Sequence, residues 1–209
     1  MGFIEDQKWR YATKKFDATK KISNKDLDVL KESIQLAATS YGLQLFKVLI
    51  VENKQKRDLL QPASWGQSQI VDASHLMVFC NFTEVTEEHL NHYAGIKANA
   101  SNIPVESLSG YMQFIQSTIE ARTPEQIDTW TAKQTYIGLA NLMNAAAELH
   151  IDTCPIEGFD ASKYDEILGL SDKGLAAAVV CSVGYRSEED TTQAVPKVRK
   201  SLEDLFEVV

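Results

Sequence analysis

The stretch "YIGLANLMNAAAELHIDTCPIEGFD" spans Tyr136–Asp160 and joins the most apolar helical pattern of the chain to a short loop. Residues 136–149 are apolar nearly all round, which predicts a buried central helix and not a surface helix. The loop "CPIEGFD" follows, with Pro155 and Gly158. Because proline cannot continue a helix and glycine readily takes the left-handed turn that ends one, this loop can serve simply as a helix stop. It can equally hold exposed backbone N–H groups against a ligand, and the rest of the sequence has to decide.

Strand and helix patterns surround this stretch. Apolar runs rich in β-branched residues predict strands, at least half buried, at Leu45–Glu52, Ser74–Phe82 and Leu175–Tyr185. Periodicity and capping residues predict the helices. The first helix is expected at Ile4–Lys15, and the second is capped by Ser23 and Asp26 and has the apolar face Leu27, Leu30, Ile34 and Ala37. A third is expected at Thr86–Ala100, and a fourth begins at Pro104. The last begins at Thr123 and Pro124, is capped with the help of Gln126, and runs to His150.

Composition places the chain among ordinary globular proteins. With 209 residues, 44% of them hydrophobic and 24% charged, it can bury a full core, which predicts one domain over residues 1–209. The cysteines Cys80, Cys154 and Cys181 are odd in number and lie in or beside apolar runs, which favours reduced core thiols. No apolar run is long enough to span a membrane, and the start "MGFIEDQKW" lacks a cationic signal region. We therefore expect a cytoplasmic protein without a membrane partner.

Charge is unevenly distributed along the chain. The net charge is −8, yet six basic residues lie between Lys8 and Lys21 against one acid, Asp17, and "PKVRK" adds Lys197, Arg199 and Lys200. An acidic protein repels nucleic acid, so no nucleic-acid partner is expected. Two basic segments favour a small anion bound where they meet, although each by itself is also explained as a solvated face.

Familiar catalytic motifs are missing. The sequence has no GxGxxG, GxxxxGK[ST], GxSxG or HExxH, so dinucleotide-fold, P-loop, hydrolase and zincin chemistry lack support. His89 and His92 lie three residues apart among glutamates, but without a third ligand we interpret them as a solvated helix face and predict no metal site. His75 and His150 are interpreted as core or helix-end residues.

Five segments, in order along the chain, carry these features. They are "RYATKKFD" (Arg10–Asp17), "ATSYGLQLFKVLIV" (Ala38–Val51), "GQSQIVDASHLMVFC" (Gly66–Cys80), "WTAKQTYIGLANLMNAAAELHIDTCPIEGFD" (Trp130–Asp160) and "VPKVRK" (Val195–Lys200). Together they resemble the nitroreductase family, and more narrowly its oxygen-insensitive NAD(P)H nitroreductase and dihydropteridine reductase branch. The resemblance implies an α+β fold with a mostly antiparallel central sheet wrapped by helices. It also implies an intertwined homodimer with one FMN in each of two interface sites, reduced by NADH or NADPH.

The resemblance assigns the main cofactor contacts. Pro155, Ile156, Glu157 and Gly158 would pass over one flavin face, with the backbone N–H of Glu157 or Gly158 directed at flavin N5. A backbone donor suits that task because it keeps its proton at every pH. Lys14 would lie near flavin N1 and O2, where negative charge develops on reduction. Arg10 and Arg199 would bind the phosphate, with Lys197 beside them.

Further positions carry over by the same resemblance, and some depart from the family pattern. Thr39, Ser40 and Tyr41 match a turn lining the pocket, Gln67 and Gln134 are amide partners for the flavin edge and ribityl chain, and Tyr41, Trp65 and Phe114 would contact substrate. Tyr11 and Ala12 replace a common basic-Ser pair, Gly66 replaces an Asn, and Gln69 replaces a Lys found in some relatives. These positions would still border FMN, with one phosphate-binding hydroxyl fewer.

The implied activity is a ping-pong reduction, by two electrons, of nitroaromatics, quinones or similar acceptors. Reduction of enoates, dihydropteridines or free flavin on the same scaffold is an alternative, and a non-enzymatic FMN-binding or sensing protein is an alternative of another class. The apolar arm at about residues 201–209, "SLEDLFEVV", would reach over the partner subunit.

Overall fold

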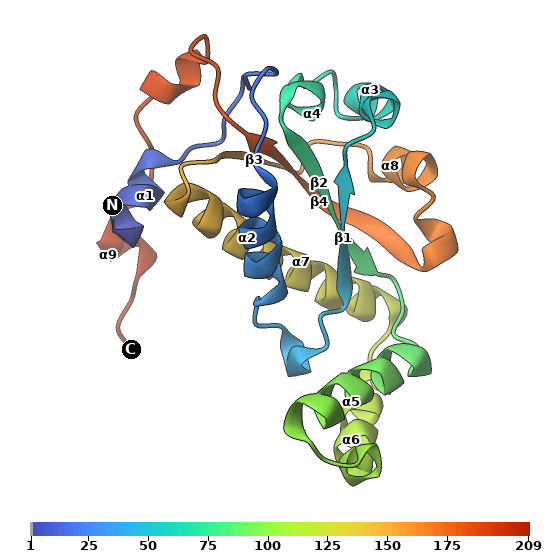
Figure 1. Cartoon of the computed structure of the whole chain (residues 1–209). Coiled ribbons are helices and arrows are strands. Elements are labelled where there is room, and N and C mark those ends of the chain that lie inside the picture. The colour runs from blue at the N-terminus through green and yellow to red at the C-terminus, as the bar shows by residue number, and fades with distance from the viewer. Residues whose placement is uncertain (1) are drawn as a thin grey trace.

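A four-stranded antiparallel sheet forms the centre of the protein (Figure 1). The structure is a computed structural model and describes residues 2–209. The strands run in the order β1-β2-β4-β3. Their bounds are β1 Phe46–Val51, β2 His75–Phe82, β3 Asp152–Ile156 and β4 Leu175–Gly184. The two inner strands, β2 and β4, are almost wholly buried because helices cover both faces of the sheet.

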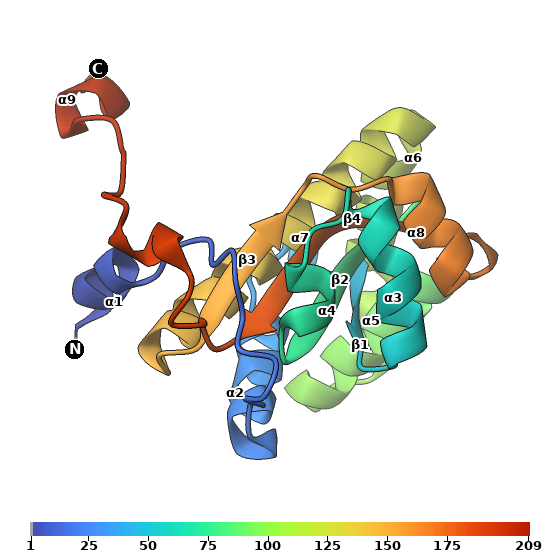
Figure 2. The same ribbon diagram turned by 90° about the horizontal axis from the view of Figure 1, so that it is seen from above.

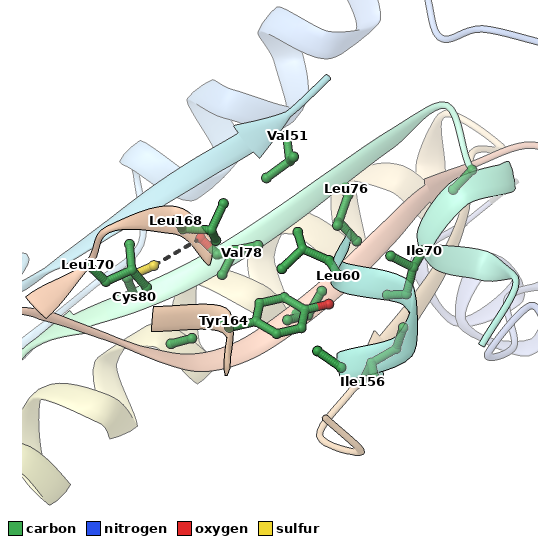
Figure 3. Close-up of a cluster of buried hydrophobic side chains, with 14 of the residues drawn as sticks. Val51, Leu60, Ile70, Leu76, Val78, Cys80, Ile156, Tyr164, Leu168 and Leu170 are labelled. Carbon is green, nitrogen blue, oxygen red and sulfur yellow. Dashed lines mark hydrogen bonds between the residues drawn. The ribbon is translucent and has the colours of Figure 1, made fainter. Parts of the chain in front are cut away.

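Alternate residues of β2 define two cores, one on each face. On one face Met77 and Phe79 pack against α2 (Asn24–Gln35) and α7 (Pro124–Glu148). On the other face Leu76 and Val78 pack against α3 (Lys54–Ala63), α4 (Gln69–Asp72) and α8 (Ala161–Leu168) (Figure 2). Figure 3 shows this second core, in which the Tyr164 ring is fully buried.

A third cluster lies at the end of the molecule away from α1 (Figure 1). It joins η1 (Ser40–Gly42), α5 (Glu87–Ser101) and α6 (Ser109–Glu120) to the first turns of α7. The short helix η2 (Val105–Leu108) connects α5 to α6. Its buried members are Leu43, Leu45, Leu90, Ile115 and Ile119.

The two ends of the chain lie together at the β3 edge. After α1 (Phe3–Trp9), Ala12 forms a parallel bridge with Thr153 of β3, and Phe16 bridges to Arg186, just beyond β4. Along the chain, η3 (Ser171–Lys173) precedes β4, and η4 (Thr191–Ala194) and α9 (Leu202–Leu205) follow β4. The arm that carries α9 projects from the body near α1 (Figures 1 and 2).

A buried ion pair holds the α1 end in place. Arg186 pairs with Asp152, with Nη2 2.6 Å from Oδ1, and Asp152 is 3% exposed. The Arg186 guanidinium also lies over the rings of Trp9 (4.3 Å) and Tyr11 (4.6 Å). Cation–π contact on two rings therefore joins α1 to the strand edge.

Most sequence predictions of local structure are confirmed. The three predicted strands correspond to β1, β2 and β4, and the side chains of Ser23 and Thr123 cap α2 and α7. The helices expected at Thr86–Ala100 and after Pro104 correspond to α5 and to η2 with α6. All three cysteines are buried free thiols.

One prediction of local structure is wrong, and one of the two interpretations of the stretch Cys154–Asp160 does not hold. The helix expected at Ile4–Lys15 ends at Trp9, because Arg10 is extended and the Thr13 N–H donates to the Thr153 carbonyl of β3 instead. The stretch Cys154–Asp160 is not the helix stop, since α7 ends at Glu148 and Asp152–Ile156 is β3. Proline is tolerated there because β3 is an edge strand of the sheet. Helices α3, α4 and α8 were not predicted.

Candidate anion and cofactor site

The two basic segments meet in the folded chain. Arg10 is half-buried at the end of α1, and Arg199 and Lys197 lie close to it after η4. Burial and then the nearby Arg199 charge lower the pKa of Arg10. Burial, Arg10 and Arg199 likewise lower the pKa of Lys197. Cations that disfavour one another's charge in this way form a site that a bound anion would stabilise.

Lys197 has a second task within this cluster. Its ammonium donates to the carbonyl oxygens of Gln7 (2.6 Å) and Lys8 (3.1 Å) in the last turn of α1 and of Arg10, which follows the helix. A lysine has three donors, and all three are used here. Because a helix C-terminus favours a cation, Lys197 fastens the C-terminal segment to α1.

Lys14 and Gln69 converge on Cys154 of β3. The Lys14 Nζ and the Gln69 Nε2 each lie 3.9 Å from the Cys154 Sγ. Burial raises the pKa of the Cys154 thiol, although the Lys14 charge opposes the shift, so the sulfur is a neutral acceptor. The structure thus brings Lys14 and Gln69, both expected to border the flavin, to strand β3, which leads into the loop 155–158.

The loop after β3 is held from two sides. The Tyr136 hydroxyl of α7 donates to Glu157 Oε1 at 2.5 Å, and the Gln67 amide donates to the Gly158 carbonyl at 2.8 Å. A Cβ added at Gly158 would lie 2.6 Å from the Trp65 ring, so only glycine fits beneath that ring as it lies here. Among residues 2–209, the Gly158 N–H has no hydrogen-bond partner. The loop is therefore held by α7 and by Gln67, and its Gly158 N–H is available to a ligand.

Other expected site residues have structural surroundings of their own. The Tyr11 hydroxyl donates to Asp190, and Ala12 bridges to β3. Gly66 has φ +76 in the turn between α3 and α4, which favours glycine over asparagine there. Gln134 is 2% exposed, and its Oε1 has no partner within the described residues.

A second set of expected residues lies away from the basic cluster. Thr39, Ser40 and Tyr41 are in or next to η1, and Tyr41 packs against the third cluster, which lies away from α1 (Figure 1). The Tyr41 ring meets Phe114 of α6 edge-on, with centroids 6.2 Å apart. One chain therefore does not bring this aromatic group to Arg10 and Arg199.

The histidines play structural parts. His89 Nδ1 accepts from the Thr86 N–H in the capping box of α5, and His75 is 9% exposed against Ser74. His150 stacks on Trp9 just beyond α7. Within residues 2–209, no three His, Cys, Asp or Glu side chains are grouped to hold a metal.

The fold and site define an α+β protein whose two chain ends build one cationic site beside a rigid loop. The model of the nitroreductase family matches residues 8–185, and the chain belongs to that family. A Staphylococcus epidermidis protein named "Putative NAD(P)H nitroreductase" is 38% identical, over 95% of this chain and 92% of its own length. The Bacillus subtilis protein named "Putative NAD(P)H nitroreductase YfkO" is 32% identical, over 99% of this chain and 96% of its own length.

Solved structures share the whole fold at low sequence identity. One is described as a "putative NAD(P)H:FMN oxidoreductase" from S. epidermidis, with a TM-score of 0.89 and 18% identity over 100% of this chain and 96% of that one. A "putative nitroreductase in complex with FMN" from Exiguobacterium sibiricum has a TM-score of 0.85 and 20% identity over 100% of this chain and 98% of that one. The predicted family and the predicted α+β fold are confirmed. No helix within residues 2–209 combines the length and apolar character needed to cross a bilayer.

Proposed function

We propose that this nitroreductase-family chain is an FMN-dependent NAD(P)H oxidoreductase that reduces nitroaromatics, quinones or similar acceptors by two electrons. The observation that carries the proposal is the cationic cluster of Arg10, Lys197 and Arg199 at the same sheet edge as the loop 155–158. The cluster fits the phosphate dianion of FMN, and the loop offers the N–H of Gly158. The FMN complex of the E. sibiricum protein and the NAD(P)H in the relatives' names support the choice of cofactor and reductant.

Bound FMN would supply the redox chemistry, taking two electrons from NADH or NADPH and passing them to the acceptor in a ping-pong cycle. The protein's own groups would bind and orient it. Arg10 and Arg199 would bind the phosphate, and the Lys14 ammonium would stabilise negative charge that forms on reduction. Tyr136 and Gln67 hold the loop from which the Gly158 N–H would be donated.

A homodimer would complete the site. The third cluster, to which Tyr41 belongs and which Phe114 contacts through Tyr41, lies away from α1 (Figure 1), so a second copy would supply Thr39, Ser40, Tyr41 and Phe114 to the site at Arg10. The arm offers the surface for such contact, because Leu202, Leu205 and Phe206 are 62–72% exposed. Large apolar side chains in that state favour burial against a partner.

An anaerobic titration of the purified yellow protein tests the proposal. NADH or NADPH should bleach the flavin absorbance, and a nitroaromatic or quinone added afterwards should restore it, with free FMN at equal concentration as the control. A flavin that stays oxidised would favour a binding or sensing protein. Reoxidation by an enoate or a dihydropteridine but by no nitroaromatic or quinone would reassign the acceptor.

A further inference from the structure

A buried carboxylate stands behind the cationic cluster. Asp190, in the turn after β4, is 2% exposed. Its Oδ2 accepts hydrogen bonds from the Tyr11 hydroxyl (3.0 Å), the Lys14 N–H (2.9 Å) and the Lys15 N–H (3.2 Å). Its Oδ1 accepts from the Thr192 N–H at 2.9 Å. Three of the four donors come from the N-terminal segment, 175 to 179 residues away along the chain.

Asp190 is charged without an ion-pair partner among the described residues. Burial acts to raise its pKa, but the hydrogen bonds from Lys14, Thr192, Lys15 and Tyr11 outweigh burial, and its pKa lies below the usual value. A carboxylate held by several N–H groups is fixed in direction as well as in charge. Asp190 therefore holds the N-terminal segment, residues 11–15, against the turn after β4, and we call this contact the joint.

The joint lies where the two basic segments come together. Beside it, the Ser187 N–H donates to the Lys15 carbonyl at 2.9 Å, and Phe16 bridges to Arg186. Arg10 and Lys14 lie on the N-terminal side of this contact. Lys197 and Arg199 follow on the C-terminal side, after η4, whose first turn the Asp190 side chain caps.

We propose that Asp190 is a positioning residue of the phosphate site, which sets Arg10 at a fixed separation from Lys197 and Arg199 without touching the ligand. The inference rests on the proposed function, because it takes the phosphate of FMN as the anion. Loss of the joint lets the two basic segments move apart. A ligand that bears a phosphate loses affinity, and an otherwise equal ligand without phosphate does not.

The test compares FMN with riboflavin, which lacks the phosphate, in fluorescence titrations of the apoprotein. Asp190→Asn is the main variant, since an amide has one acceptor oxygen and must turn an NH₂ against an N–H donor in either orientation. We expect the Kd of FMN to rise about tenfold or more and that of riboflavin to change less than about twofold. Glu189→Gln is the matched control, because within residues 2–209 this neighbouring exposed carboxylate pairs only with the Lys15 ammonium. It should leave both constants unchanged.

Tyr11→Phe gives a second, milder variant that removes one donor and keeps the charge, so the inference stays testable if Asp190→Asn does not fold. Tyr11→Phe should lower the ratio of the riboflavin Kd to the FMN Kd about threefold. Equal weakening of FMN and riboflavin in the variants, or no weakening of FMN, would overturn the positioning role while leaving the phosphate site intact. A wild-type protein that binds riboflavin as tightly as FMN would instead remove the phosphate site itself, and the inference with it.

Discussion

Arg199→Ala should have opposite effects on the empty and the FMN-bound protein. In the structure the Arg199 charge lies close enough to lower the pKa of Arg10, so without an anion the two guanidinium groups repel each other. Removing one of them relieves that repulsion, and the melting temperature of the apoprotein should stay level or rise. With FMN present, the same change removes one or two charge-assisted hydrogen bonds. Each contributes about 1.5–3 kcal/mol, so loss of one should raise the Kd of FMN about 10- to 150-fold.

Thermal unfolding of the apoprotein and FMN titration at one fixed salt concentration measure the two effects. Lys200→Ala is the matched control, because it removes one positive charge at the next, equally exposed position. It should change the Kd far less than Arg199→Ala does. An unaltered Kd in both Arg10→Ala and Arg199→Ala would place the anion site elsewhere, and a lower apoprotein melting temperature would contradict the repulsion.

Three further predictions concern charge, loop and arm. Lys14→Ala should lower the two-electron potential of the bound flavin, by about 30 mV for each 1.4 kcal/mol by which Lys14 stabilises reduced over oxidised flavin. Spectroelectrochemistry measures the potential, and Lys15→Ala is the control. A Lys14→Ala potential equal to those of wild type and Lys15→Ala would refute the prediction. Tyr136→Phe should lower the melting temperature below pH 10, because the bond to Glu157 is lost. Burial and then Glu157 raise the pKa of Tyr136 from 10.0 to about 12, so the stabilising contribution of Tyr136 should fade as pH rises through that range, and a pH-independent difference argues against it. Deleting Ser201–Val209 should give a partly monomeric, FMN-poor protein in sedimentation and absorbance measurements, and a stable dimer with full flavin is the contrary result.

Local patterns were enough to predict most of the fold. The strand β2 and the caps of α2 and α7 depend on residues close in sequence, so periodicity and Ser or Thr at the N-cap reveal them. Strand β3 was missed because Pro155 suggested a break, whereas its role depends on pairing with β4 and on lying at the sheet edge. The end of α1 was missed for the same reason, since the bond that replaces its helical hydrogen bonding reaches to Thr153.

The sequence predicted the part of the site that depends on charge alone. Two basic segments indicated an anion, and the structure brings Arg10 and Arg199 together. Asp190 was missed because it ends the run "SEED", whose acids suggest a solvated surface, and burial of one of them is not visible in composition. Tyr136 was missed because it lies in an apolar helical stretch, and its contact with Glu157 arises only when β3 lies beside α7.

The contact of the two chain ends has a consequence for how the protein is made. A growing chain leaves the ribosome N-terminus first, so Tyr11, Lys14 and Lys15 must wait for Asp190, up to 179 residues later, before their bonds can form. Pairing of such distant segments is slow, because a long loop has to close before any contact compensates for its lost entropy. The contact therefore forms only after residue 190 has been added to the chain, long after its N-terminal partners. A ligand that binds only the completed site stabilises the protein after this step, so bound flavin should raise the folded fraction of newly made protein.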